Sequence, residues 1–140
     1  VLSDEGSFYC PQSFTAQSIS YTHKFSQTTG IDECRGWETI ALPFDVQIIS
    51  HERLGVISPF TATDGSVRKF WLCDLSDDGF IWSDAIKANT PYIISMPNNE
   101  AYATPYILTG NIIFESENVT MIILMGHLYV CFFFLCGLYV

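Results

Sequence analysis

The chain has 140 residues and carries 15 acidic against 6 basic residues, for a net charge of −9 at pH 7. This length fits one domain, whose core needs neither a metal nor a disulfide for stability. The acidic balance argues against binding to a nucleic-acid backbone, which depends on clustered Lys and Arg. Aromatic residues make up 15% of the chain, which excludes disorder for most of it.

Alternation of apolar and polar residues predicts the first strand at residues 17–25. The same pattern predicts a second strand over residues 37–44. Pro43 should end or bend this strand, because proline has no backbone N–H for the ladder. Residues 46–49 are expected to continue in extended conformation.

Residues 69–75 are apolar on both faces, which predicts a central strand between two packed layers. The Asp-Gly pair at residues 78–79 indicates a hairpin turn into a strand at residues 80–82. Residues 91–96 and 111–114 supply two more short strands. These elements are typical of a sandwich or barrel, and we expect an all-β fold, a two-layer antiparallel β-sandwich of the jelly-roll type.

The composition changes abruptly near the C-terminus, since no charged residue follows Glu117. We therefore expect an N-terminal extension at residues 1–15, a β-sandwich domain at residues 16–119 and an apolar tail at residues 120–140 outside the sandwich. The tail is long enough to span a bilayer, but no Lys or Arg follows it to specify an orientation. A membrane anchor, a buried terminal element and non-native coding sequence remain as interpretations.

The histidines outside the tail favour structural roles. His23 falls on the apolar face of its predicted strand, where a hydrogen-bonded core histidine is expected. Ser50, His51 and Glu52 are adjacent, but neighbours along a strand point to opposite faces, so the adjacency has no catalytic meaning. No standard catalytic motif occurs, although a carboxylate pair of the glycosidase kind stays open.

Residues 74–79 (DLSDDG) resemble the opening of a calcium loop, with Gly at the sixth position. The twelfth position is Ala85, where a bidentate Glu is required. A hairpin turn is therefore favoured, with weak surface calcium binding by Asp77 and Asp78 as the alternative. We predict no metal site and no cofactor.

The cysteines form no C-x-x-C pair, and three of them lie outside the tail, which is no disulfide framework. Cys10 and Cys34 are the one disulfide pairing that we consider. Cys73 lies inside the predicted central strand, where it should behave as a small hydrophobe.

Aromatic side chains offer the other candidate chemistry, because exposed rings can stack on sugars. Strand aromatics usually lie in a core, but Phe70 and Leu72 can fill the core opposite Trp71 and so leave its ring outside. The candidate ligand-binding residues are Trp71, Trp82 and Tyr92, with Tyr102 and Tyr106 as further members of a stacking platform.

Four segments carry a family resemblance: residues 19–25 (ISYTHKF), 36–44 (GWETIALPF), 70–75 (FWLCDL) and 86–95 (IKANTPYIIS). Together they resemble β-rich accessory domains of secreted and cell-surface proteins of Bacteroidales, often found beside leucine-rich repeats or adhesin-type modules. The resemblance covers about residues 16–119 and implies no active site.

We therefore expect a non-enzymatic, extracellular structural or adhesion module of a bacterial cell-surface protein. The alternative is a carbohydrate-binding module that uses exposed aromatics, and a glycoside-cleaving enzyme is less favoured. The expected partners are neighbouring domains of a longer protein and a glycan or host protein. We expect no nucleic acid, and a membrane only through residues 120–140. The chain begins with Val1 and shows no export signal, so we interpret it as a fragment or mature form.

Overall fold

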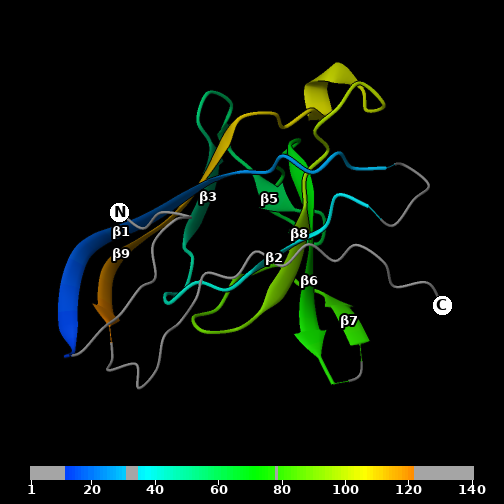
Figure 1. Cartoon of the computed structure of the whole chain (residues 1–140). Coiled ribbons are helices and arrows are strands. Elements are labelled where there is room, and N and C mark those ends of the chain that lie inside the picture. The colour runs from blue at the N-terminus through cyan, green and yellow to red at the C-terminus, as the bar shows by residue number, and fades with distance from the viewer. Residues whose placement is uncertain (1–11, 31–34, 78, 122–140) are drawn as a thin grey trace.

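The computed structural model describes residues 12–30, 35–77 and 79–121. In these residues the fold is all-β, as predicted, with mainly antiparallel sheets and no α-helix. A 3-10 helix, η1 (Thr104–Tyr106), precedes the last strand. The strands are β1 (Phe14–Lys24), β2 (Glu38–Ile40), β3 (Ile48–His51), β4 (Gly55–Val56), β5 (Ser58–Pro59), β6 (Lys69–Ser76), β7 (Gly79–Trp82), β8 (Tyr92–Ser95) and β9 (Asn111–Met121) (Figure 1).

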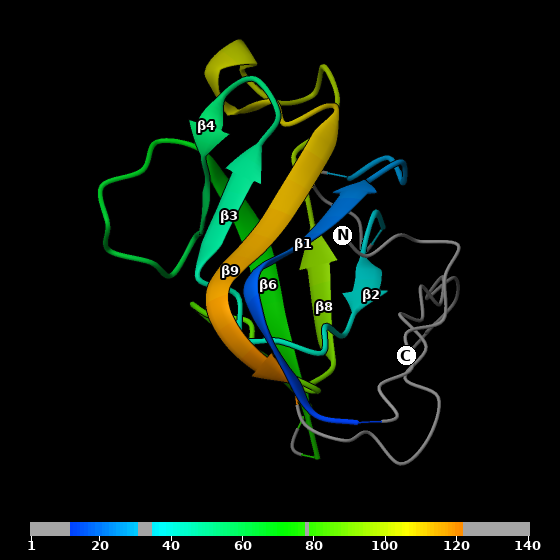
Figure 2. The same ribbon diagram turned by 90° about the vertical axis from the view of Figure 1, so that its left-hand side faces the viewer.

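One sheet has the strand order β1-β9-β3-β4. The long strands β1 and β9 are antiparallel, from the pair Phe14–Met121 at one end to the pair Lys24–Asn111 at the other. They curve together along one side of the molecule, as Figures 1 and 2 show. The first and last strands of the described chain, β1 and β9, are therefore neighbours in this sheet. Strand β3 pairs with the other edge of β9.

Strand β9 changes its buried face part-way along its length. Ile112, Phe114 and Ser116 are buried in regular alternation, yet Met121 is buried as well, which breaks the period of two. Between them lies Asn118, which has a φ of 52°, a left-handed conformation that Asn tolerates better than most residues. This conformation turns the end of β9 back toward the core.

The other sheet has the order β2-β8-β6-β5, and β7 also pairs with β6. The β6–β7 hairpin closes at the pair Ser76–Gly79, and Gly79 has a φ of 106°, which confirms the predicted hairpin. Strand β5 is parallel to β6 through the pair Ser58–Lys69. Strands β5 and β7 therefore pair with successive parts of β6, β5 with its beginning and β7 with its end.

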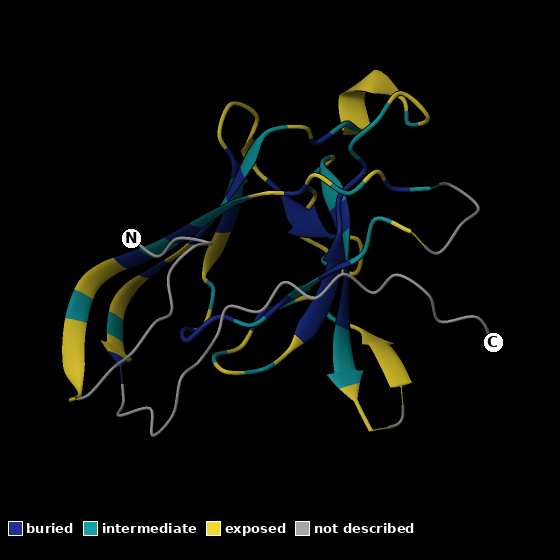
Figure 3. Cartoon of the chain, viewed as in Figure 1, coloured by how far each residue is buried: buried dark blue, intermediate teal, exposed yellow. Residues whose placement is uncertain are grey.

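The hydrophobic core contains buried side chains from both sheets. Their burial is visible as the dark blue segments of the strands in Figure 3. Two members, Leu42 and Phe44, come from the loop after β2 and are 0% and 1% exposed. The bulkiest fully buried side chains are Tyr21, Phe44, Phe70 and Phe114.

The predicted strand at residues 37–44 is too long, because β2 ends at Ile40. Pro43 lacks the N–H that a longer ladder requires. The alternating apolar residues continue past the strand because Leu42 and Phe44, in the loop after β2, are buried in the core. Sequence reasoning missed β4 and β5, which have two residues each. A strand this short has no alternation to detect.

The predicted domain covers residues 16–119, and the first and last described strands extend two residues beyond each of these bounds. Strand β1 begins at Phe14 and β9 ends at Met121, and these two residues face each other in the ladder. Met121 is 2% exposed, so the start of the predicted tail contributes to the core. Residues 122–140 lie outside the described part of the chain.

Candidate ligand-binding face

Aromatic side chains gather on the outer face of the sheet that contains β6. Residues that pair directly across antiparallel strands share a face, and Cys73 pairs with Ile93 on one side and with Trp82 on the other. The hydrophobic core includes Phe70 and Leu72 of β6 but neither Cys73 nor Ile93. Trp82, Cys73 and Ile93 therefore share the face that points away from the core.

Three rings lie in contact, tilted against one another, at one end of this outer face. The ring centroids of Phe60 and Trp71 are 5.1 Å apart, and those of Trp71 and Tyr102 are 5.7 Å apart. Phe60 is 51% exposed, whereas the other two are half-buried. Trp71 therefore contacts two other rings, which restrict the positions that its side chain can take.

Two more rings meet across the middle of the face. The centroids of Trp37 and Trp82 are 6.5 Å apart, although β2 and β7 are separated by two strands and hence by about 14 Å. Both indoles must therefore lie over the strands between them, which explains why Cys73 and Ile93 are each 5% exposed. Trp82 itself remains 56% exposed.

Burial raises the pKa of the Cys73 thiol, so the thiol stays protonated near neutral pH. Cys73 is free and buried, which confirms that it acts as a small hydrophobe. We call the set of five rings the aromatic face; its members are Trp37, Phe60, Trp71, Trp82 and Tyr102.

A polar clasp holds the chain segment after β1 against the end of β8. The side-chain amide of Asn98 donates to the carbonyl of Gln27 at 2.7 Å, and its oxygen accepts from the backbone N–H of Thr29 at 3.2 Å. The hydroxyl of Tyr102 donates to the carbonyl of Gly30 at 3.4 Å, and burial raises its pKa. The clasp thus fixes one ring of the aromatic face.

The residue before Trp37 is fixed by the same clasp. Ser95 donates its hydroxyl to the carbonyl of Gly36 at 2.8 Å. Gly36 has a φ of 80°, and a Cβ built on it would lie 2.5 Å from the Cα of Thr29. Only glycine fits here, and the position of Trp37 depends on it.

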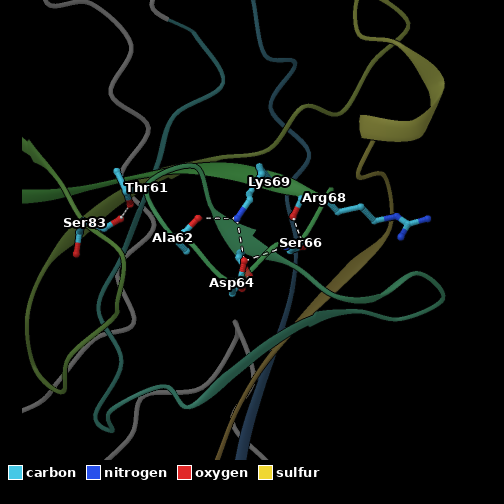
Figure 4. A network of polar contacts seen from close by, with 8 residues as sticks. Thr61, Ala62, Asp64, Ser66, Arg68, Lys69 and Ser83 are labelled. Carbon is cyan, nitrogen blue, oxygen red and sulfur yellow. Dashed lines mark hydrogen bonds and ion pairs between the residues drawn. The ribbon is translucent and has the colours of Figure 1, made fainter.

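The loop that carries Phe60 is braced by a charged network, shown in Figure 4. The ammonium group of Lys69 donates to the carbonyl of Ala62 and to Asp64 Oδ1, both at 2.9 Å. Asp64 also accepts from the hydroxyl of Ser58 and from the backbone N–H of Ser66. Hydrogen bonds from Ser58 and Lys69 hold the pKa of Asp64 well below its usual range.

A second contact joins this loop to the strand that carries Trp82. Thr61 donates its hydroxyl to the carbonyl of Ser83 at 2.8 Å (Figure 4). The side chain of Arg68 points away from the network, and its Nε has no hydrogen-bond partner in the described structure. This hydrogen bond joins the residue after Phe60 to the residue after Trp82 and so helps to hold the two rings in a fixed relation.

Two of the three predicted ligand residues lie on the aromatic face and one does not. Trp71 and Trp82 are on it, whereas Tyr92 is 3% exposed and belongs to the core. Its hydroxyl accepts from the backbone N–H of Lys87 at 3.1 Å. Tyr92 alternates with the outward residue Ile93 along β8, so the prediction for Tyr92 is wrong.

The remaining predicted residues have different positions. Tyr102 belongs to the aromatic face, and Tyr106 is 52% exposed on η1. Cys10 and Cys34 lie outside the described residues. The sequence analysis did not include Trp37 and Phe60 among the ligand-binding candidates. Trp37 could have been found, because it is an odd number of residues from the buried Ile40 and so points to the other face of its strand.

His23 is a structural histidine, as predicted. Its Nε2 lies 2.9 Å from Glu38 Oε2, and the two side chains are 11% and 6% exposed. The edge of the His23 ring meets Phe25 with centroids 4.6 Å apart. Glu38 was missed by sequence reasoning, although it shares the inward parity of Ile40. The pair joins β1 to β2 and hence one sheet to the other.

The adjacent residues His51 and Glu52 have separate partners. Nε2 of His51 lies 2.8 Å from the carbonyl of Thr109, and Nδ1 accepts from the backbone N–H of Arg53, so the proton resides on Nε2. The carboxylate of Glu52 accepts from the side-chain amide of Asn111 at 2.8 Å. Hydrogen bonding to Asn111 lowers the pKa of Glu52. This arrangement resembles no catalytic dyad.

The described residues contain no group of three or more His, Cys, Asp or Glu side chains placed to hold a metal ion. In the segment with calcium-loop character, residues 74–76 and Gly79 pair in the β6–β7 hairpin. Asp78 lies outside the described residues. Within residues 12–30, 35–77 and 79–121, no helix is both long enough and apolar enough to cross a membrane.

Comparison of the chain with protein-family models, with curated proteins and with solved structures found no match.

Proposed function

We propose that the chain is a two-layer antiparallel β-sandwich of the jelly-roll type. Support comes from the nested strand pairing, in which β1 pairs with β9 and β2 pairs with β8. Strand β3 then lies on the far side of β9, and β6 lies on the far side of β8. This nested pairing across two sheets is the arrangement expected of a jelly roll.

We further propose that this domain is a non-enzymatic binding module of an extracellular, cell-surface protein and that its aromatic face holds a carbohydrate. The observation that carries the proposal is the gathering of five aromatic rings on one outer sheet face. Trp, Tyr and Phe present flat apolar surface at a small cost in side-chain entropy. The apolar C–H face of a pyranose ring is complementary to such a surface.

The outer face of the other sheet provides a contrast within the same molecule. Its residues on β1 and β9 include Ser20 paired to Glu115 and Ser18 paired to Glu117. Its exposed apolar residues on β3 and β4, Ile48 and Val56, are aliphatic. A polar or acidic outer face is usual for an antiparallel sheet that has one face exposed to solvent. The aromatic content of the opposite face therefore needs a reason beyond folding, and ligand binding supplies one.

The test uses intrinsic fluorescence, because all three tryptophans of the chain, Trp37, Trp71 and Trp82, belong to the aromatic face. Neutral oligosaccharides, including glucan and N-acetylglucosamine oligomers, are titrated into the full chain. We expect saturable quenching. Trp82→Ala should weaken binding about tenfold or more, as loss of a central aromatic contact does.

Phe14→Ala provides the matched control, because Phe14 is 44% exposed on β1, in the other sheet. This variant should bind as the wild type does. If no oligosaccharide changes the fluorescence, or if Trp82→Ala binds unchanged, the carbohydrate proposal fails.

A further inference from the structure

The segment that builds most of the aromatic face is also strongly acidic. Residues 60–84 supply Phe60, Trp71 and Trp82, and they contain five Asp residues against one Arg and one Lys. The Lys of this segment, Lys69, is already paired with Asp64. The net charge of the segment is therefore negative.

Two of these carboxylates flank strand β7, which carries Trp82. Asp77 follows the last paired residue of β6, in the β6–β7 turn, and Asp84 follows Trp82 by two residues. Both are exposed and form no ion pair or hydrogen bond within the described structure. Trp37 lies at the β2 side of the aromatic face, away from β7. The basic residue closest to Trp37 in the sequence is Arg35, two residues before it.

We propose that the aromatic face prefers glycans that carry protonated amino groups, such as glucosamine oligomers, over neutral and anionic glycans. This inference rests on the carbohydrate proposal above. A sugar stacked on Trp82 brings its substituents within a Debye length, about 10 Å at moderate salt, of nearby carboxylates. An ammonium group is attracted there, and also by the ring itself through a cation–π contact, whereas a uronate is repelled.

The experiment compares three oligomers of equal length on the full chain at about pH 5.5, above the usual pKa of Asp. The probes are a glucosamine oligomer, its N-acetylated counterpart and an oligogalacturonate. We expect the glucosamine oligomer to bind about fivefold more tightly than the acetylated one at low salt. The preference should largely disappear at about 0.5 M salt, and the galacturonate should bind most weakly.

Two double variants, each of which removes two negative charges, test which sheet face causes the preference for amino sugars. The double variant Asp77→Asn with Asp84→Asn should lose most of the preference and keep its affinity for the acetylated oligomer. The double variant Glu115→Gln with Glu117→Gln changes the opposite sheet face by the same two charges and should keep the preference.

Each other outcome overturns the inference. Equal loss in both double variants would mean that total charge, and not the aromatic face, sets the preference. Equal affinity for an oligolysine of matched charge would mean that no sugar is being recognised. If the acetylated oligomer binds but the amino form shows no advantage, this inference fails while the carbohydrate proposal stands. If neither binds, both fail.

Discussion

Gly36 stands where the clasp after β1 meets the beginning of β2. Its φ of 80° is one that residues with a Cβ rarely adopt, and the space that a Cβ would need is occupied by the backbone of Thr29. Backbone atoms of a clasped segment cannot move aside as the end of a flexible side chain can. The aromatic face therefore depends on a residue that has no side chain.

Gly36→Ala should destabilise the protein by at least about 2 kcal/mol more than Gly65→Ala does. Gly65 has a similar φ of 78°, but nothing lies within 4 Å of the position that its Cβ would take. The control thus carries the backbone strain alone, about 1 kcal/mol. Urea unfolding of both variants measures the difference, and equal losses would show that Thr29 can make room.

The ionisation of a single residue, Asp64, makes the stability of the fold depend on pH. Its pKa in the folded chain lies below the ordinary value of 3.8 because Ser58 and Lys69 donate to the charged form. A group whose folded pKa is depressed stabilises the fold above its unfolded pKa, and this contribution is lost as pH falls through the folded value.

The wild type should therefore be more stable than Asp64→Asn at neutral pH, and the difference should shrink as pH falls below 3.8. Urea unfolding over a pH series measures this. Asp77→Asn removes no hydrogen bond and serves as the control. A difference for Asp64→Asn that stays constant with pH would contradict the assignment.

At the scale of elements, β9 carries more of the fold than its sequence indicates. It pairs with β1 on one edge and with β3 on the other, and it delivers Ile112, Phe114 and Met121 to the core. Its beginning was predictable from alternation at residues 111–114. Its end was not, because the left-handed Asn118 shifts the buried face and hides the period.

Met121→Ala should lower the free energy of unfolding by about 2–4 kcal/mol, as truncation of a buried core side chain does. Val56→Ala is the control, because Val56 is 60% exposed at the edge strand β4, and it should change stability by less than about 0.5 kcal/mol. Chemical denaturation of both measures this. A near-neutral Met121→Ala would mean that the fold ends before residue 121.

At the scale of the whole molecule, a buried hydrogen-bonded pair of side chains joins the two sheets. His23 on β1 and Glu38 on β2 are in contact at 2.9 Å, with little exposure of either. Breaking such a pair is costly because one polar group is left buried without its partner, whereas replacing both groups by apolar ones is often tolerated.

Glu38→Leu should therefore destabilise the protein by about 3 kcal/mol, and adding His23→Leu should restore much of that loss. A double-mutant cycle by urea unfolding measures the coupling. Additive losses in the double variant would show that the two side chains do not act as a pair.

The fold class was predictable from the sequence because alternation and turn residues are local signals, as residues 69–82 show for β6 and β7. The aromatic face was predictable only in part. Trp71 and Trp82 lie in strands with readable parity, but the contact of Phe60 with Trp71 depends on the parallel pairing of β5 with β6. Long-range pairing of this kind leaves no local signal.

The pairing of Phe14 with Met121 places the first residue of β1 and the last residue of β9 at the same end of the β1–β9 ladder. Tension applied between these two residues loads the hydrogen bonds one after another, whereas tension between Lys24 and Met121 loads many of them at once. Single-molecule pulling should therefore separate the strands at lower force in the first geometry. A tether attached at that end would peel β1 from β9 before it disturbed the rings on the other sheet.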